Sequence, residues 1–356
     1  MTARGSSSPD PRRLGPGTGH EQSGGKRCTL EVDTTIRGDA GGVGKDPIMT
    51  ERLALAVIPG VGWSAADTQA IAREAEAAGF DAIFAAEVNN DVMATAQLMG
   101  AATSRIQVGT WIANIYLRHS YSCAQGAALI ADATGGRFIL GLGVSHQPIN
   151  QALGIAMPQP LATLRRYATE VRGWLRGEGP ATHLPQRPSP QPVPLYVAAL
   201  GERAVELGGE LADGIMPLFW TAERVAQSKA WAARGRERAP ELGPVDITLG
   251  LPTFIGDDLE ALREAARQNL VLYTGLPFFQ RLFQEMGFPE EAALMERGEG
   301  MASLSDRLLD GICLIGPIQR CQEQLAAFRE AGVDLPILYP PIGVDGARQV
   351  LQAFRR

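Results

Sequence analysis

Short apolar runs alternate with longer amphipathic patterns along most of the chain, from Leu53 to Tyr339. Each run is short and rich in apolar residues, which is typical of strands buried on both faces of a parallel sheet. The first run stops at Pro59-Gly60, a strong turn signal. The pattern predicts eight strands, at residues 53–58, 81–86, 106–112, 138–144, 195–199, 213–216, 247–254 and 335–339.

The segments between these strands show helical periodicity. Residues 65–78 follow Ser64, a good N-cap, and stop at Gly79. Further helices are predicted at 91–103, 121–133, 161–175, 202–211 and 318–331, and two more, at 257–273 and 277–284, as an insertion before the last unit. Strands alternating with helices predict an α/β fold, a closed (β/α)8 TIM barrel. A doubly wound sheet with a second, helical domain is the alternative.

Two segments differ in composition from this pattern. Residues 1–48 are rich in Gly, Ser, Pro and Arg and have little apolar periodicity, so we expect a disordered leader there and a barrel domain at 49–356. Met49, just before the first strand, is a candidate translation start, which an intact mass of the native protein would test. A Pro-rich connector at 180–194 is not expected to be helical.

The overall charge narrows the range of partners. A net charge of -6 and a pI of about 5.4 argue against nucleic-acid binding, and neither a polybasic segment nor a membrane-length apolar run points to a membrane. The four cysteines form no C-x-x-C pair, which favours a reduced, cytoplasmic protein. The four histidines are scattered, so no metal site is expected.

The active site of such a barrel lies at the carboxyl ends of its strands. One candidate there is the sequence GLGVSH, residues 141–146, whose glycines would let the backbone approach a flat ligand and whose Ser145 and His146 would face the barrel mouth. The alternative is that the glycines only relieve crowding between strands.

A second candidate lies where strand 195–199 turns into a helix. The residues Ala199, Leu200, Gly201 and Glu202 would expose backbone N–H groups at a helix N-terminus, which favours an anion such as a phosphate. An ordinary strand-to-helix turn is the alternative.

Polar residues after the second and third strands form a third candidate. Asn114 and Tyr116 would hydrogen-bond a cofactor ring or donate a proton, and Glu87 would orient a substrate or transfer a proton. Glu87 could equally pair with a loop arginine and have no chemical role. Arg118 and His119 are better explained as fixing the start of the next helix, and Phe219 and Trp220 as packing.

In this order, several segments resemble the luciferase-like monooxygenase superfamily, especially its branch that depends on the deazaflavin coenzyme F420. The resemblance covers roughly residues 53–345 and is carried by FDAIFAAE (80–87), IQVGTWIANIYLRHS (106–120), GGRFILGLGVSHQP (135–148), MPQPLATLRRY (157–167), PVPLYVAALGERAVELGGELADGIMP (192–217) and GVDLPILYP (332–340). It implies a homodimeric barrel with the cofactor ring in its mouth and a cis peptide bond between Trp111 and Ile112.

The resemblance also implies a function. We expect hydride transfer between F420 and a small organic substrate, with phosphate bound near Gly201 and the proton handled by His146, Glu87 or Tyr116. The ring would lie among Trp111, Ile112, Ala113, Asn114, Gly143, Val144 and Ser145. The substrate side would include residues 272–283.

The chain also departs from the branch. Its sugar-phosphate dehydrogenases carry a catalytic His and Glu where this sequence has Val88 and Val144, which argues against glucose-6-phosphate oxidation, and the usual Arg-His-Pro reads Arg118-His119-Ser120. Two alternatives stay open: a monooxygenase that uses flavin mononucleotide (FMN), and a non-catalytic flavin-binding protein.

Overall fold

The structure is a computed structural model that describes residues 51–179 and 187–356. The expected leader at 1–48, the candidate start at Met49 and the first part of the Pro-rich connector lie outside the described residues. Residues 187–194 of the connector are described, and they contain no helix, as predicted.

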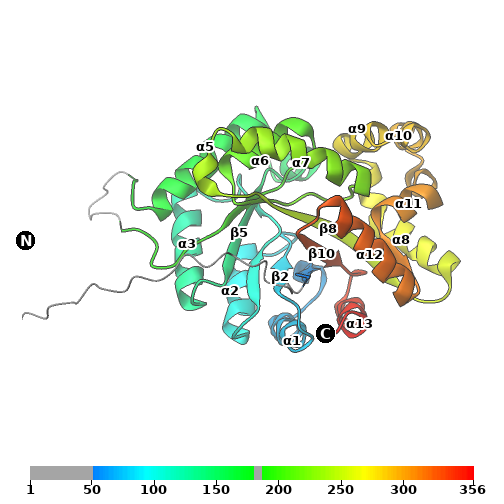
Figure 1. Cartoon of the computed structure of the whole chain (residues 1–356), viewed down its shortest axis with the longest axis horizontal. Helices are drawn as coiled ribbons and strands as arrows, with labels where there is room; N and C mark the ends of the chain where they lie inside the picture. Colours follow the sequence, from blue (N-terminus) through cyan, green and yellow to red (C-terminus); the bar gives the residue numbers. More distant parts are fainter. Residues whose placement is uncertain (1–50, 180–186) are drawn as a thin grey trace, which may run out of the picture. The chain divides into compact units, whose positions relative to one another are not determined.

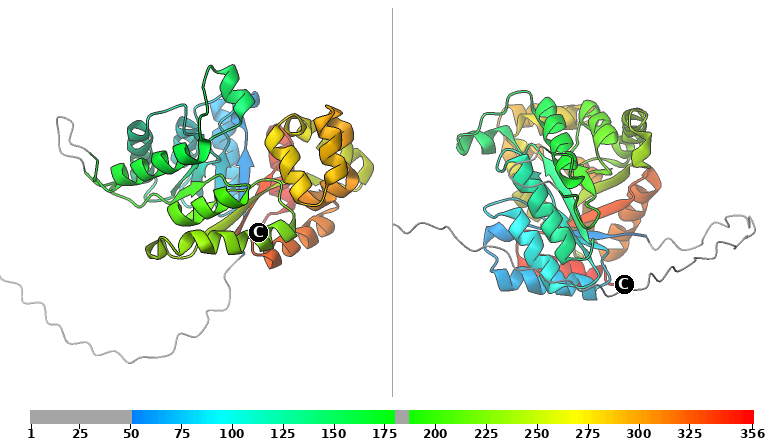
Figure 2. Two further views of the ribbon diagram at one scale, coloured as in Figure 1. Left: turned by 90° about the horizontal axis from the view of Figure 1, so that it is seen from above. Right: turned by 90° about the vertical axis from the view of Figure 1, so that its left-hand side faces the viewer.

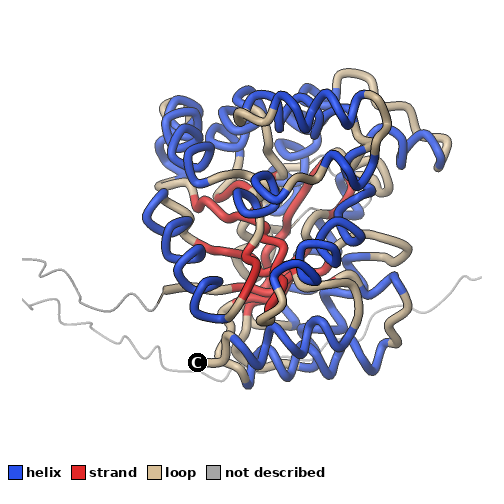
Figure 3. Tube along the Cα trace, turned by 90° about the vertical axis from the view of Figure 1, so that its right-hand side faces the viewer, coloured by secondary structure: helices blue, strands red, loops and turns tan. Residues whose placement is uncertain are grey.

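In the described part of the chain, eight parallel strands close into a barrel surrounded by helices (Figure 1; Figure 3). The last strand pairs with the first through Ala54 and Ile337 and with its other neighbour through Leu335 and Thr248, which closes the ring. The predicted (β/α)8 barrel is therefore confirmed over the doubly wound alternative. Its strands are β1 (Ala54–Val57), β2 (Ala82–Ala85), β3 (Gln107–Thr110), β5 (Phe138–Gly143), β6 (Leu195–Val197), β7 (Gly214–Ile215), β8 (Asp246–Ile255) and β10 (Leu335–Tyr339).

The predicted third strand is interrupted. It ends at Thr110 and resumes only as the short β4 (Ala113–Asn114), which pairs with β5 further along. Between the two pieces, the Thr110 hydroxyl donates to Gly141 O (2.7 Å) and accepts from Gly141 N (2.9 Å). The Thr110 side chain thus continues the hydrogen bonding to β5 between β3 and β4, where the backbone no longer pairs.

Six of the eight outer helices agree closely with the predicted ones: α1 (Ala65–Ala77), α2 (Val92–Ala102), α3 (Ser120–Ala133), α5 (Pro160–Leu175), α6 (Glu202–Leu211) and α12 (Ile318–Ala331). The other two, α7 (Ala222–Arg236) and α13 (Val344–Ala353), were not predicted. Ser64 caps α1 as predicted, since its hydroxyl accepts from Asp67 N and Asp67 accepts from Ser64 N. No described helix has the length and apolar character needed to cross a membrane.

Helix α7 was not predicted, and its packing explains why. It approaches α6 through small residues: a Cβ on Gly209 would lie 2.2 Å from Ala232 O, and a Cβ on Gly235 would lie 2.0 Å from Glu206 O. Helices that touch through glycine and alanine need no stripe of large apolar residues. The periodicity that reveals the other helices is therefore weak in α7.

The predicted insertion lies between β8 and α12, and it is longer than expected. It contains α8 (Leu259–Thr274), α9 (Pro277–Glu285), α10 (Pro289–Glu296), α11 (Asp306–Ile312) and β9 (Leu314–Gly316). Strand β9 pairs with the far end of β8 through Thr253–Ile255. The helices α8 to α11 group at one side of the barrel, yellow to orange in Figure 2.

The barrel interior is filled by side chains. Ala54, Ala56, Ala82, Phe84, Ile139, Tyr196, Met216, Leu335 and Ile337 form one buried cluster, with Trp111 and Ile112 packed against it. A larger apolar core lies between the strands and the outer helices. Because the interior is filled, a ligand site belongs at an end of the barrel rather than inside it.

Candidate active site

Glu87, just after β2, is fixed by bonds within the protein. Its carboxylate accepts from both terminal nitrogens of Arg118, from Asn114 N (2.6 Å) and, more weakly, from Val92 N (3.4 Å). The Glu87 side chain is 5% exposed and that of Arg118 is 14% exposed. The geometry therefore favours the alternative given above, pairing with a loop arginine, over proton transfer by Glu87.

Asn114 is also engaged within the protein. Its side chain donates to Asn150 Oδ1 (2.8 Å) and accepts from Tyr116 N (3.1 Å). Asn150, on the short helix α4 (Gln147–Ala152), is fully buried and in turn donates to Val144 O (2.9 Å). This network fixes the loops after β4 and β5 to each other. Asn150 was missed by the sequence reasoning, although it follows GLGVSH closely.

The peptide bond between Trp111 and Ile112 is cis, as predicted. The Trp111 ring meets Tyr339, the last residue of β10, edge to face with centroids 5.7 Å apart, and lies against Gly250 of β8. Trp111 thus covers the end of the barrel interior. Ala113, in β4, is buried.

The two glycines of GLGVSH relieve crowding, as the alternative above held. A Cβ on Gly141 would lie 2.2 Å from Thr110 O and 2.6 Å from Met216 Sδ, and a Cβ on Gly143 would lie 2.6 Å from the side chain of Ile112. Protein atoms, rather than open space, therefore require glycine at both positions.

His146 packs against the insertion. Its ring centroid lies 6.3 Å from that of Tyr273 and 5.7 Å from that of Phe279, both on insertion helices. Phe219, after β7, joins the same group at 4.7 Å from Tyr273. Burial lowers the pKa of His146, so its imidazole is neutral at pH 7 and able both to donate and to accept a proton.

Three tyrosines, Tyr116, Tyr273 and Tyr339, are further candidates for a hydroxyl donor. Burial raises the pKa of Tyr273 and of Tyr339, so both hydroxyls stay protonated. The Tyr116 hydroxyl is buried and has no hydrogen-bond partner among the described residues. A buried hydroxyl without a partner is costly unless a ligand or water satisfies it.

The loop from Ala199 to Glu202 is positioned by Trp220, after β7, and by Arg224 on α7. Leu200 O accepts from Trp220 Nε1 (3.2 Å) and Arg224 Nη2 (3.4 Å), and Trp220 is fully buried, so it packs rather than stacks on a ligand. Gly201 caps α6 with no side-chain bond, and the Glu202 carboxylate turns to Arg234. The first N–H groups of α6 therefore remain available to an anion.

Four non-glycine residues in the segments that follow strands adopt left-handed backbone angles, among them Asn89 and Gln159. Ser145, after β5, has φ 57°, and Phe219, after β7, has φ 59°. Such conformations cost about 1–3 kcal/mol each and cluster at functional sites. Ser145 and Phe219 flank His146 and the insertion.

The predicted site residues thus fall into separate groups. Glu87, Asn114 and Tyr116 are linked by hydrogen bonds. Asn150, which bonds Asn114, donates its N–H to His146 O (3.0 Å), so the backbone of His146 joins this network, whereas its imidazole makes no hydrogen bond to the described residues. The insertion connects the remaining parts, since Phe279 contacts His146 and Phe278 lies 3.8 Å from a Cβ placed on Gly201.

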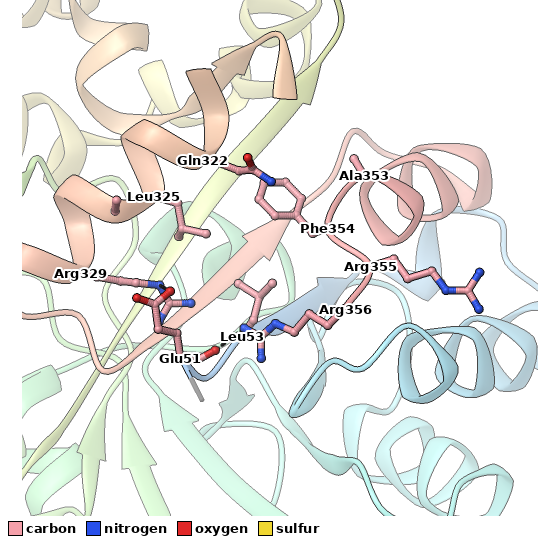
Figure 4. A pocket seen from close by; sticks show the side chains of 10 residues that line it. Glu51, Leu53, Gln322, Leu325, Arg329, Ala353, Phe354, Arg355 and Arg356 are labelled. Atoms are coloured by element: carbon pink, nitrogen blue, oxygen red, sulfur yellow. Dashed lines mark hydrogen bonds and ion pairs between the residues drawn. The ribbon is translucent and has the colours of Figure 1, made fainter. Parts of the chain in front are cut away.

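Two cavities found in the structure lie away from this mouth. One of about 350 Å³ lies between α3 and the end of α5. The other, of about 320 Å³, is at the amino-terminal end of the strands (Figure 4), lined by Glu51, Leu53, Gln322, Leu325, Ala326, Arg329, Ala353, Phe354, Arg355 and Arg356. We nevertheless place the candidate site at the mouth, because that end carries the chemistry of this fold.

The sequence has relatives among known proteins. Residues 52–335 match the family model described as luciferase-like monooxygenase. A Mycobacterium tuberculosis protein with the provisional name coenzyme F420-dependent oxidoreductase is 29% identical over 306 residues, which cover 74% of this chain and 88% of that protein.

Solved structures share the fold. The coenzyme F420-dependent tetrahydromethanopterin reductase of Methanopyrus kandleri matches with a TM-score of 0.72 and 17% identity, over 85% of this chain and 97% of that chain. The oxygenating constituent of 3,6-diketocamphane monooxygenase from Pseudomonas putida, solved with FMN, has a TM-score of 0.61 and 16% identity, over 85% and 96%. At these identities the likeness shows the fold alone.

Proposed function

The chain belongs to the luciferase-like monooxygenase family, and from this premise we propose that it is an oxidoreductase transferring a hydride between coenzyme F420 and a small organic substrate. The observation that carries the proposal is the uncapped N-terminus of α6 at the barrel mouth. A deazaflavin cofactor has an acidic tail, which suits free N–H groups at the positive end of a helix dipole. The F420-dependent name of the mycobacterial relative supports the choice of cofactor.

The residues at the mouth fit such a group. Gly201 has only an ordinary contact, to Phe278, where a Cβ would stand, so an anion can approach the first turn of α6. The unpartnered Tyr116 hydroxyl offers a donor beside the fixed loop of Asn114. When bound, F420 supplies two-electron hydride chemistry and lacks the ring nitrogen through which a flavin reacts readily with oxygen.

Each part of the mouth has a role in this proposal. The N–H groups of Glu202 and Arg203 hold the phosphate, while Ile112 to Asn114 and Gly143 to Ser145 border the ring. The bonds from Glu87 and Asn150 keep those two loops in place. His146, neutral because it is buried, moves the proton that accompanies the hydride, with Tyr116 as a second donor.

Titration of the purified full chain with F420 and with FMN tests the proposal. We expect F420 to bind at micromolar or lower concentration, its reduced form to be oxidised by at least one member of a substrate panel without oxygen, and FMN to bind more weakly. Turnover that requires FMN and consumes oxygen would contradict it.

One observation favours the FMN monooxygenase as the second candidate, namely the shared fold with an enzyme solved with FMN. In that case oxygen uptake would follow addition of reduced FMN. A protein that binds either cofactor without turnover across the whole panel would instead be a non-catalytic binding protein.

We also propose a cytoplasmic homodimer, as expected for the family. Leu117 and Leu129, before and on α3, are exposed apolar side chains that a second copy could cover. The three described cysteines are unpaired. Light scattering at several protein concentrations tests the oligomer, for which a monomer at every concentration is the contrary result.

A further inference from the structure

The cavity at the amino-terminal end of the strands, shown in Figure 4, brings together three segments that are far apart in the sequence. Glu51 and Leu53 lie just before β1, residues 322–329 belong to α12, and residues 353–356 form the end of α13 and the chain after it. The volume of about 320 Å³ is near the lower end of the range for ligand sites and suits a small organic molecule. The proposed function makes no use of this amino-end cavity.

Two arginine side chains meet at the amino-end cavity. Arg329 Nη2 donates to Arg52 O (2.7 Å). Arg356 Nη2 donates to Glu51 O, the carbonyl of the residue before Arg52. Because adjacent carbonyls hold the two guanidinium groups, two positive charges lie close together. Burial, together with the nearby charge of Arg356, lowers the pKa of Arg329, although its guanidinium stays charged.

The carboxylates beside these arginines compensate them unequally. Arg356 pairs with Asp81 at 3.0 Å. Arg329 pairs only loosely with Glu51, since Nε and the carboxylate oxygen are 3.5 Å apart and the Glu51 side chain is 76% exposed. The Arg329 side chain is itself 12% exposed, and its Nε has no hydrogen-bond partner among the described residues. A largely buried cation thus depends on a carboxylate that remains mostly in water, and an anion in the cavity would compensate it better.

The rest of the lining is mostly apolar. Leu53, Leu325 and Phe354 face the cavity from the three segments, and Ala326 and Ala353 add small, less buried side chains. Arg355 also belongs to the lining, but its exposed side chain points away from the cavity in Figure 4. The cavity therefore combines a positively charged edge with an apolar surface.

We infer that the amino-end cavity is a second ligand site, which binds a small organic carboxylate through Arg329 and Arg356. A guanidinium matches the plane of a carboxylate and donates two parallel hydrogen bonds to it. The apolar body of the ligand lies against the side chains around Leu53. The inference is independent of the proposed redox function, because this site is at the other end of the barrel. A ligand there connects β1, α12 and the chain after α13, and so stabilises the folded barrel.

Binding of three probes to the cofactor-free full chain tests the inference. Benzoate has a carboxylate and an apolar ring, benzamide has the same shape without the charge, and acetate has the charge without the ring. We expect benzoate to bind tightest, and benzamide and acetate each at least about tenfold more weakly. Hydrogen–deuterium exchange with benzoate should show added protection at 322–329 and 353–356. Benzamide binding as tightly as benzoate, no benzoate binding below about 10 mM, or protection confined to the start of α6 would overturn the inference.

Two variants change the charge of the cavity in opposite directions. Arg329→Gln removes the largely buried cation and should weaken benzoate at least about tenfold. Glu51→Gln removes the competing carboxylate and should tighten benzoate about two- to fivefold. Because this side chain is exposed, the variant should fold normally. Arg355→Gln, which removes an equal charge whose side chain points away, is the matched control and should change the affinity by less than about twofold.

The variants also distinguish a defined site from general attraction of anions. Equal weakening of benzoate in Arg329→Gln and Arg355→Gln would show only that positive charge near the cavity attracts anions. Unchanged affinity in Glu51→Gln would show that the ligand carboxylate does not meet Arg329. Either result overturns the inference. If Arg329→Gln does not fold, the response of Glu51→Gln decides alone.

Discussion

The two ends of the barrel use similar residues in different ways. At the amino-terminal end, the aspartate before one strand holds the start of another: Asp81 accepts from Leu53 N (2.8 Å), Asp213 from Leu195 N (2.7 Å) and Asp334 from Ile247 N (2.8 Å). Asp81 and Asp213 each also pair with an arginine.

At the mouth, the Glu87 carboxylate has the comparable role, because it accepts from Asn114 N. Other groups at the mouth are strained or lack a hydrogen-bond partner. Ser145 and Phe219 have left-handed backbone angles, and the Tyr116 hydroxyl has no partner. The difference teaches that an acidic residue after or before a strand does not by itself indicate catalysis. Its hydrogen bonds decide whether it belongs to the scaffold or is free to act on a ligand.

The largest expected effect tests whether Glu87 belongs with the scaffold acids. Glu87→Ala leaves the largely buried Arg118 without its partner. We therefore expect the free energy of unfolding to fall by about 3–5 kcal/mol, as for other broken buried pairs. Glu202→Ala, which breaks an exposed pair with Arg234, is the control and should change stability by under about 1 kcal/mol. Urea unfolding measures the stability of both variants. A loss in Glu87→Ala as small as that in Glu202→Ala would show that Glu87 does not stabilise the scaffold.

A somewhat smaller effect is expected at the opposite end. Asp213→Ala leaves Leu195 N unsatisfied at the start of β6 and should lower the free energy of unfolding by about 1–3 kcal/mol. Because this end is far from the proposed chemistry along each strand, kcat/KM at a temperature where the variant is folded should stay within about twofold. A large loss of kcat/KM in the folded variant would contradict the assignment of stability to one end of the barrel and activity to the other.

Tyr116→Phe should affect cofactor binding or turnover and leave stability nearly unchanged. Removing a buried hydroxyl that has no protein partner should leave the free energy of unfolding unchanged or slightly raised. The affinity for F420 or its turnover should fall roughly 2- to 10-fold, the worth of one hydrogen bond. A stability loss above about 1 kcal/mol with normal affinity would make Tyr116 a scaffold residue instead.

The smallest expected effect is a difference in how the stability contributions of His146 and Glu76 depend on pH. Burial lowers the pKa of folded His146 below its usual value near 6.5, so protonation favours unfolding and its contribution to stability falls as the pH drops below about 6.5. Glu76 responds at lower pH. Against burial, the N–H groups of Ile106, Arg105 and Ser104 lower its pKa from 4.5 to about 2, so its contribution is complete above about 4.5 and is lost toward pH 2.

Melting temperatures of His146→Phe and Glu76→Gln, compared with the parent protein at several pH values, test whether the two groups respond in different pH ranges. His146→Phe should reduce the loss of stability between pH 7 and pH 5, and Glu76→Gln should reduce only the loss below pH 4.5. If both variants change the same pH range, the two ends do not differ in their response to acid.

Much of the scaffold was predictable from periodicity. All eight barrel strands and most outer helices were found because their buried positions are apolar and regularly spaced. Four strand starts were set one residue early, and at two of them the residue is an aspartate, Asp81 or Asp213, which belongs to the loop and bonds across to a neighbouring strand. Helix α10, helix α11 and β9 are too short to show a period.

The site was less predictable because its contacts are distant in sequence. Glu87 and Arg118, or Asn114 and Asn150, meet only once the barrel closes. The signal for Tyr339 was its place at the end of a strand, and Tyr273 lies in the segment expected on the substrate side. Neither signal shows how the two residues are arranged in space, because that depends on how the insertion folds back.

Hydrogen–deuterium exchange of the full chain with and without F420 tests the central claim most directly, since it shows which end of the barrel the cofactor covers. The account predicts added protection at the mouth, in residues 87–90, 110–116, 143–147 and 199–203, and none around the opposite cavity at 322–329 and 353–356. Protection confined to the opposite end, or unchanged exchange at the start of α6 with F420 bound, would contradict it.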